Sequence, residues 1–161
     1  MSMARIIKRL GDSTGATLIE AAIVTPLLLL LTFSIVDFGS LFYVYLSLEN
    51  GVSQATRAVV TGNLLDDPAK AGSKLSRADS IKLAMRSATP TLNIPDAAFT
   101  FQHMPRGGTA WLGGVAGPDE IEKVTVNYNW QLMTPLLRPF FANGQLSFRV
   151  ESTMKTESKF E

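Results

Sequence analysis

A long run of apolar positions follows residues 1–15 of the chain. Within residues 16–36 only Glu20 is charged, and after Asp37 a second uncharged stretch occupies residues 38–48. A helix through both stretches would be about 46 Å long at about 1.5 Å per residue, whereas the hydrocarbon core of a bilayer is about 30 Å thick. The pattern therefore predicts a helix that spans a membrane and protrudes beyond it.

The helical period continues past the predicted span. Val52, Ala55 and Val59 keep spacings of three and four, and Gly62-Asn63 is a natural stop for a helix. We therefore predict three parts: a basic cytoplasmic leader, an N-terminal helix whose membrane span covers about residues 18–40, and an extracytoplasmic α+β domain. These parts are residues 1–15, 16–61 and 62–161.

A second amphipathic helix is predicted after the turn at Asp66-Asp67-Pro68. Its apolar stripe recurs at spacings of three and four, as one face of a helix requires. The stripe consists of Leu75, Ala78, Ile81, Met85 and Ala88. Basic residues are expected on the opposite, solvated side: Lys74, Arg77, Lys82 and Arg86.

The remainder of the chain changes to a period of two, which is typical of strands with one buried face. Clear alternation occurs in residues 99–103, 124–130 and 146–154, and a weaker strand is predicted at residues 109–112. Three or four antiparallel strands with one apolar face need a cover, which the two helices can provide. The predicted fold class is α+β and pilin-like, with the second helix packed on a small antiparallel sheet.

The charges of the leader predict the orientation of the span. Arg5, Lys8 and Arg9 precede the apolar run, and basic residues remain on the cytoplasmic side of a membrane. Everything after Asp37 is then outside the cytoplasm. A cleaved secretory signal is the alternative, but residues 35–40 lack the small-x-small pattern of its cleavage site, so we expect the helix to be retained.

Composition excludes several other classes of function. The formal net charge is +1, which does not predict a nucleic-acid partner, and the absence of cysteine excludes disulfides and thiolate metal sites. His103 is the only histidine, and one histidine does not make a site. The acidic residues of the segment 119–122 lack the spacing of a calcium loop, so a solvated turn is expected there. We predict no catalytic residue, no cofactor and no metal.

The most informative stretch is the hexapeptide GATLIE at residues 15–20, between the basic leader and the apolar run. It resembles the site of a prepilin peptidase, a membrane protease that cuts after the glycine and leaves the apolar helix on the mature protein. The resemblance implies that Gly15 and Ala16 form the processing site. Ala16 would become the new N-terminus, about one helical turn from Glu20.

Two interpretations of Glu20 are open. A carboxylate inside a packed bundle of membrane helices is costly unless it is paired, so pairing with the new ammonium group of a neighbouring subunit would stabilise assembly and set its register. Alternatively, Glu20 only marks the headgroup end of the span, where acidic residues are tolerated.

The wider sequence resembles the TadE-like proteins of the tight-adherence (Flp) pilus system. The resemblance rests on the leader, on the proline-containing, leucine-rich run at residues 20–29, on the acidic and aromatic continuation at 36–43 and on the helix at 50–57. The segments at 124–128 and 134–137 and the last strand are similar as well. The resemblance implies a non-enzymatic minor pilin or pseudopilin that contributes to the assembly or priming of an adhesion pilus.

Two further residues of the span have open interpretations. Pro26 lacks a backbone N–H and is expected to kink the helix, either as a device of pilin-like helices or as a tolerated irregularity. Asp37 either ends the span at the headgroups or forms a buried polar contact between assembled subunits.

The predicted location is the inner membrane, as a single-pass protein, and then the pilus. The partners that follow are membrane lipid, the prepilin peptidase, and other pilins and pilus-assembly proteins that contact the N-terminal helix. A face of Ala21, Ala22, Leu28 and Ile35 suits such helix contacts. The competing interpretation is an uncleaved, membrane-anchored binding or scaffolding protein of the cell envelope.

Overall fold

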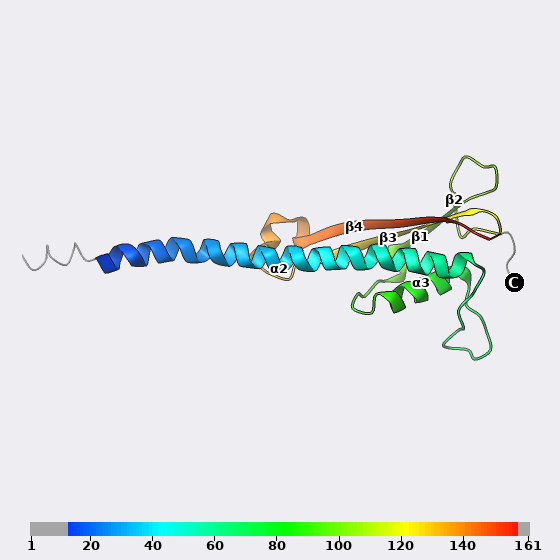
Figure 1. Ribbon diagram of the computed structural model, residues 1–161, viewed down its shortest axis with the longest axis horizontal. Helices are drawn as coiled ribbons and strands as arrows, with labels where there is room; N and C mark the ends of the chain where they lie inside the picture. The colour runs from blue at the N-terminus through cyan, green and yellow to red at the C-terminus, as the bar shows by residue number, and fades with distance from the viewer. Residues whose placement is uncertain (1–12, 158–161) are drawn as a thin grey trace, which may run out of the picture.

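The computed structural model of the chain describes residues 13–157. One long helix carries a second helix and a four-stranded sheet along its C-terminal half, whereas its N-terminal half extends alone (Figure 1). The elements are α2 (Ser13–Val60), α3 (Arg77–Ala88), β1 (Phe99–Met104), β2 (Leu112–Gly113), β3 (Ile121–Gln131) and β4 (Gln145–Lys155). The predicted α+β architecture, with a long apolar helix, a second helix and a small antiparallel sheet, is confirmed.

The sheet has the strand order β2-β1-β3-β4, and all its pairings are antiparallel. Strands β3 and β4 pair over their whole lengths, from Ile121 opposite Lys155 to Gln131 opposite Gln145. Because this register ends at Gln131 and Gln145, the connection between the two strands leaves the sheet toward the unaccompanied half of α2 (Figure 1). We call this connection, residues 132–144, the β3–β4 loop.

The core lies between the sheet and the C-terminal half of α2, with α3 beside them. The buried residues of α2 recur at helical spacing, and none of these five is more than 1% exposed: Val44, Leu48, Val52, Ala55 and Val59. They form one cluster with buried residues of α3 and of the sheet, including Ile81, Met85, Val124, Val126 and Val150. The C-terminal half of α2 therefore has one buried stripe, which is the pattern of a helix packed on a domain.

Helix α3 is set against α2 by a cap and by a close contact. The hydroxyl of Ser76 accepts a hydrogen bond from the backbone N–H of Asp79 at 3.1 Å, so the helix begins at Arg77. Near its other end, a β-carbon at Gly51 of α2 would lie only 2.7 Å from Cγ2 of Thr89. Glycine at this position therefore allows the two helices to approach each other.

A buried ion pair joins the start of α3 to the sheet, which differs from two sequence expectations. Arg77 was expected on the solvated side, but its side chain is 9% exposed, and its Nη1 lies 3.7 Å from Oε2 of Glu122. Glu122 was expected in a solvated acidic turn, but it lies in β3 and its side chain is 0% exposed. The backbone N–H of Ala116 also donates to Oε2 of Glu122 at 3.2 Å.

Burial dominates the electrostatics of this pair. It raises the pKa of the Glu122 carboxyl above its ordinary value, although the Ala116 N–H and the Arg77 guanidinium both oppose the rise. Burial likewise lowers the pKa of Arg77, and Glu122 opposes that change. Removal of one partner would leave the other charge buried and uncompensated.

Replacement of Arg77 by leucine is expected to destabilise the domain by about 3 kcal/mol at neutral pH, because it leaves the Glu122 carboxylate uncompensated. The pKa of Glu122 would then rise further. A raised folded-state pKa disfavours folding above that pKa, and the penalty shrinks as the pH falls toward the unfolded-state value. Thermal unfolding of the full chain in detergent, measured from neutral to mildly acidic pH, tests this.

The double variant Arg77→Leu with Glu122→Leu is the matched control. It removes both charges together and is expected to recover most of the stability that Arg77→Leu loses. A pH-independent loss in the single variant, with no recovery in the double variant, would show that the pair acts only through packing.

Candidate functional site

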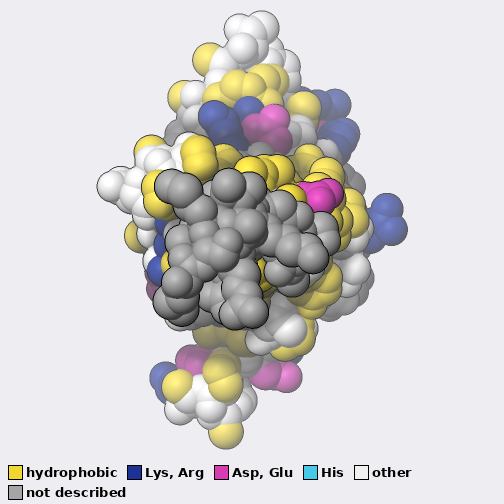
Figure 2. All heavy atoms as spheres, turned by 90° about the vertical axis from the view of Figure 1, so that its left-hand side faces the viewer, with side chains coloured by type: hydrophobic (Ala, Val, Ile, Leu, Met, Phe, Trp, Pro, Cys, Tyr) yellow, Lys and Arg dark blue, Asp and Glu magenta, His cyan; other side chains and the backbone are white. Residues whose placement is uncertain are grey.

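The N-terminal half of α2 presents apolar side chains outward on all sides. Leu18 is 70% exposed and Ile23 is 61% exposed, and an 18-residue window of the helix has a mean hydropathy of 2.2 with none of it buried. In the view from this end of the molecule, hydrophobic side chains are visible beside and below the atoms drawn in grey (Figure 2). A core helix of a soluble protein would bury such a window. By length and composition, this helix can cross a membrane.

Polar groups inside the apolar run are largely satisfied by the helix itself. The hydroxyls of Thr32 and Ser34 donate to the carbonyls of Leu28 and Leu30 at 2.8 and 2.7 Å. The α-helix continues without interruption through Pro26, which has no N–H to donate to the carbonyl four residues earlier. The predicted kink at Pro26 therefore stays a prediction, while its place inside the helix is established.

The predicted processing site lies near the beginning of the same helix. Gly15 and Ala16 are within α2, and the space around Gly15 is open, with no atom within 4 Å of a β-carbon placed there. The charged residues of the leader, Arg5, Lys8 and Arg9, lie outside the described residues.

Glu20 lies four residues after Ala16, on the same face of the helix and about 6 Å along its axis. Its side chain is exposed and forms no salt bridge with any residue that the structure describes. The structure thus brings Gly15, Ala16 and Glu20 together on two successive turns of one helix. Glu20 is available to a group outside the described chain.

The second carboxylate of this segment, Asp37, has the opposite environment. It is 1% exposed and accepts hydrogen bonds from two consecutive backbone N–H groups of the β3–β4 loop. The N–H of Met133 lies 3.0 Å from Oδ1, and that of Thr134 lies 3.2 Å from Oδ1 and 3.3 Å from Oδ2. The hydroxyl of Thr134 donates to Oδ2 as well. Asp37 therefore fastens the loop to the helix where the uncharged run ends.

This role of Asp37 is one that neither sequence interpretation contained. The donors are 96 and 97 residues away in the sequence. Two of the contacts use backbone N–H groups, which every residue except proline has, so the residue types do not indicate them. The only side-chain signal is the hydroxyl of Thr134 in a turn next to Pro135.

Aromatic residues continue the exposed apolar surface beyond Asp37. Phe42, Tyr43 and Tyr45 are 62%, 55% and 39% exposed. Tyr43 also shares a hydrogen bond of 3.1 Å with the hydroxyl of Thr91, and the Tyr45 ring lies 6.1 Å from the Phe148 ring. These rings combine an apolar body with polar or domain contacts, which suits a boundary between lipid and water.

Comparison with known protein families matches residues 15–57 to the model of TadE-like proteins. The matched segment begins at Gly15 and includes Glu20, Pro26 and Asp37. The predicted TadE-like family is therefore confirmed for this part of the chain, while the similar segments near the C-terminus lie outside the match. Comparisons with curated proteins and with solved structures give no match.

Replacement of Asp37 by alanine is expected to destabilise the domain by about 2 kcal/mol, because two backbone N–H groups lose a charged acceptor. The amides of Met133 and Thr134 should also exchange hydrogen faster. Thermal unfolding and hydrogen exchange of the full chain in detergent measure the two effects.

Two control variants separate the possible causes. Thr134→Val removes only the hydroxyl donor and should cost less than Asp37→Ala. Glu49→Ala removes an exposed carboxylate of the same helix and should change stability little. An equal effect of Asp37→Ala and Glu49→Ala would contradict the role assigned to Asp37.

Proposed function

We propose that the protein is a minor pilin or pseudopilin of a tight-adherence pilus, held in the inner membrane by α2 and processed after Gly15. The observation that carries the proposal is the TadE-like match over residues 15–57, because it covers the whole exposed apolar half of the helix. The exposed helix supplies the membrane anchor, and the packed domain is the part presented outside the cytoplasm.

Retention of the span is supported by the way the helix enters the domain. Helix α2 continues from the apolar run to Val60 without a break, and its last turns are part of the core. A signal-type cut just beyond the apolar run would detach or expose Asp37, and two backbone N–H groups of the β3–β4 loop would lose their acceptor. A cut after Gly15 leaves all of these contacts intact.

Processing after Gly15 would create the charge partner that Glu20 lacks. The new ammonium group on Ala16 would lie about one turn from the carboxylate, at the cytoplasmic edge of the membrane. In an assembly, the ammonium group of one subunit can pair with Glu20 of its neighbour. Such a pair offsets the cost of a carboxylate among packed apolar helices and favours one axial register.

The exposed surface of α2 suits contact with other pilins. A stripe of large apolar side chains on α2 continues beyond Asp37, and its members are between 47% and 65% exposed: Ile35, Phe38, Phe42 and Leu46. Small residues at Ala21 and Ala22 permit close approach of a second helix within the membrane. The proposal therefore assigns subunit contacts to the helix and requires no metal, cofactor or nucleic acid.

One observation favours the alternative of an uncleaved envelope anchor. The Gly15–Ala16 bond lies inside a helix, whereas a protease cleft accepts an extended backbone. The pilin route therefore requires the first turn to unwind in the peptidase. The mass of the mature chain distinguishes the two functions, since the alternative predicts an intact N-terminus.

Coexpression with a prepilin peptidase is expected to shorten the wild-type chain by residues 1–15, and Gly15→Val is expected to block the cut, because a branched side chain would enter a site that accepts glycine. Intact-mass measurement of the purified chain reads the result. The matched control is Gly39→Val, at a glycine of the same helix that also has open space around it. An unprocessed N-terminus in both the wild type and Gly15→Val would refute processing.

Replacement of Glu20 by glutamine is expected to leave the cut intact but reduce the amount of the protein in sheared pilus fractions severalfold, because the neighbour's ammonium loses its partner. Glu49→Gln, an exposed acid on the same helix, serves as the control. Quantitative immunoblots of pilus and membrane fractions measure the ratio. Normal incorporation of the Glu20 variant would contradict the charge pairing and would favour the interpretation that Glu20 only marks the headgroup end of the span.

A further inference from the structure

The β3–β4 loop lies at a defined level of the proposed membrane span. From Glu20 to Asp37 the helix rises about 26 Å, slightly less than the hydrocarbon thickness of about 30 Å. With Glu20 at the inner edge of the bilayer, Asp37 is therefore at its outer edge. Since Asp37 binds the N–H groups of Met133 and Thr134, the loop is held at that edge too.

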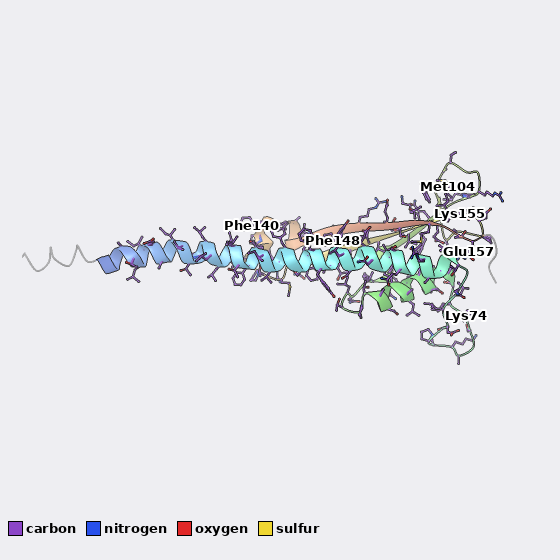
Figure 3. The ribbon with its side chains drawn as sticks, in the orientation of Figure 1. Lys74, Met104, Phe140, Phe148, Lys155 and Glu157 are labelled. Atoms are coloured by element: carbon purple, nitrogen blue, oxygen red, sulfur yellow. The ribbon has the colours of Figure 1, made fainter. Side chains whose placement is uncertain are left out.

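The loop has an apolar outer surface. Three of its large side chains point outward, with Met133 58% exposed, Leu136 49% exposed and Phe140 75% exposed. Leu132 and Leu137, in contrast, are 2% and 8% exposed. Phe140 lies beside α2, at the end of the domain nearer the unaccompanied half of the helix (Figure 3). The outward side chains thus occupy the end of the domain that adjoins the span.

The loop is also held in shape. The Nε–H of Arg138 donates to the carbonyl of Leu132 at 3.0 Å, and the N–H of Leu132 donates to the carbonyl of Gly144 at 3.1 Å. Gly144 has a φ of 65°, and a β-carbon there would lie 3.0 Å from the Arg138 side chain. The exposure of Phe140 is therefore a feature of a folded turn, since the residues on both sides of it are fixed.

We propose that the β3–β4 loop is a second membrane contact, which inserts Met133, Leu136 and Phe140 into the outer boundary of headgroups and acyl chains. This inference rests on the proposed function, because it requires α2 to span the bilayer. Two observations select lipid as the occupant. Asp37 holds the exposed apolar side chains of the loop at the end of the uncharged run of α2, and residues 132–144 contain Arg138 but no acidic residue, which suits lipid phosphates.

The contact fixes how the domain sits on the membrane. A single helix leaves the domain able to rotate about the helix axis, whereas a second point of insertion restricts that rotation. The loop then covers Asp37, so its carboxylate does not face the lipid without hydrogen-bond partners. It already accepts hydrogen bonds from N–H and hydroxyl groups of the loop. Extraction of the subunit into a pilus has to remove the loop from the lipid.

Single labels test the proposal, because the chain contains no cysteine of its own. Phe140→Cys marks the loop, Leu28→Cys marks the span, and Ala71→Cys marks an exposed turn away from both. Each full-length variant carries an environment-sensitive fluorophore and is placed, one chain per disc, in nanodiscs with nitroxide-labelled lipids. The loop label is expected to be quenched at a depth of about 5–10 Å below the headgroups, and the turn label is expected to remain unquenched.

The span label separates failure of this proposal from failure of the proposed function. Quenching of the Leu28 label without quenching of the Phe140 label would overturn the loop contact and leave the anchor standing. Absence of quenching at Leu28 would overturn the anchor itself. A blue-shifted loop label that lipid nitroxide does not quench would indicate a protein neighbour and also overturn the proposal. Met133→Cys, a second loop position, is expected to repeat the result of Phe140→Cys.

Discussion

The hydrogen bonds from the β3–β4 loop to Asp37 connect the two halves of this protein. Before Asp37, helix α2 is apolar all round, and after it the helix has one stripe buried in the domain. A carboxylate at this point is satisfied only if the sheet brings Met133 and Thr134 to it. The position of the domain along α2 is therefore set by a contact inside the chain, and the proposed membrane role of the loop follows from the same contact.

The register of the sheet makes that contact possible. Strands β3 and β4 stay paired until Gln131 faces Gln145, so the loop emerges beside the middle of α2. If β3 and β4 were shorter, the loop would lie farther along the helix toward Val60. Asp37 would then have no hydrogen-bond donors from the loop. At the other end of the sheet, the buried Arg77–Glu122 pair joins α3 to β3. Polar contacts thus hold both ends of a domain whose middle is an apolar core.

The elements could be predicted from the sequence because they are periodic. The stripe from Val52 to Val59 and the alternation in residues 124–130 belong to segments whose neighbours in sequence are also neighbours in space. The partners of Asp37 and Glu122 could not be predicted, because they depend on how distant segments meet. For Glu122, the turn-like composition before it suggested solvent, but the strand begins one residue earlier and turns the side chain toward Arg77.

The two carboxylates of the apolar run, Glu20 and Asp37, have different environments. Both Glu20 and Asp37 lie in α2, but Asp37 has its donors within the chain, whereas Glu20 is exposed and has no salt-bridge partner among residues 13–157. A satisfied carboxylate has nothing to gain from a neighbouring subunit, while an unsatisfied one does. The end of the apolar run that adjoins the domain is therefore closed by the fold. In the proposed function, the N-terminal end is the part of the helix that depends on assembly.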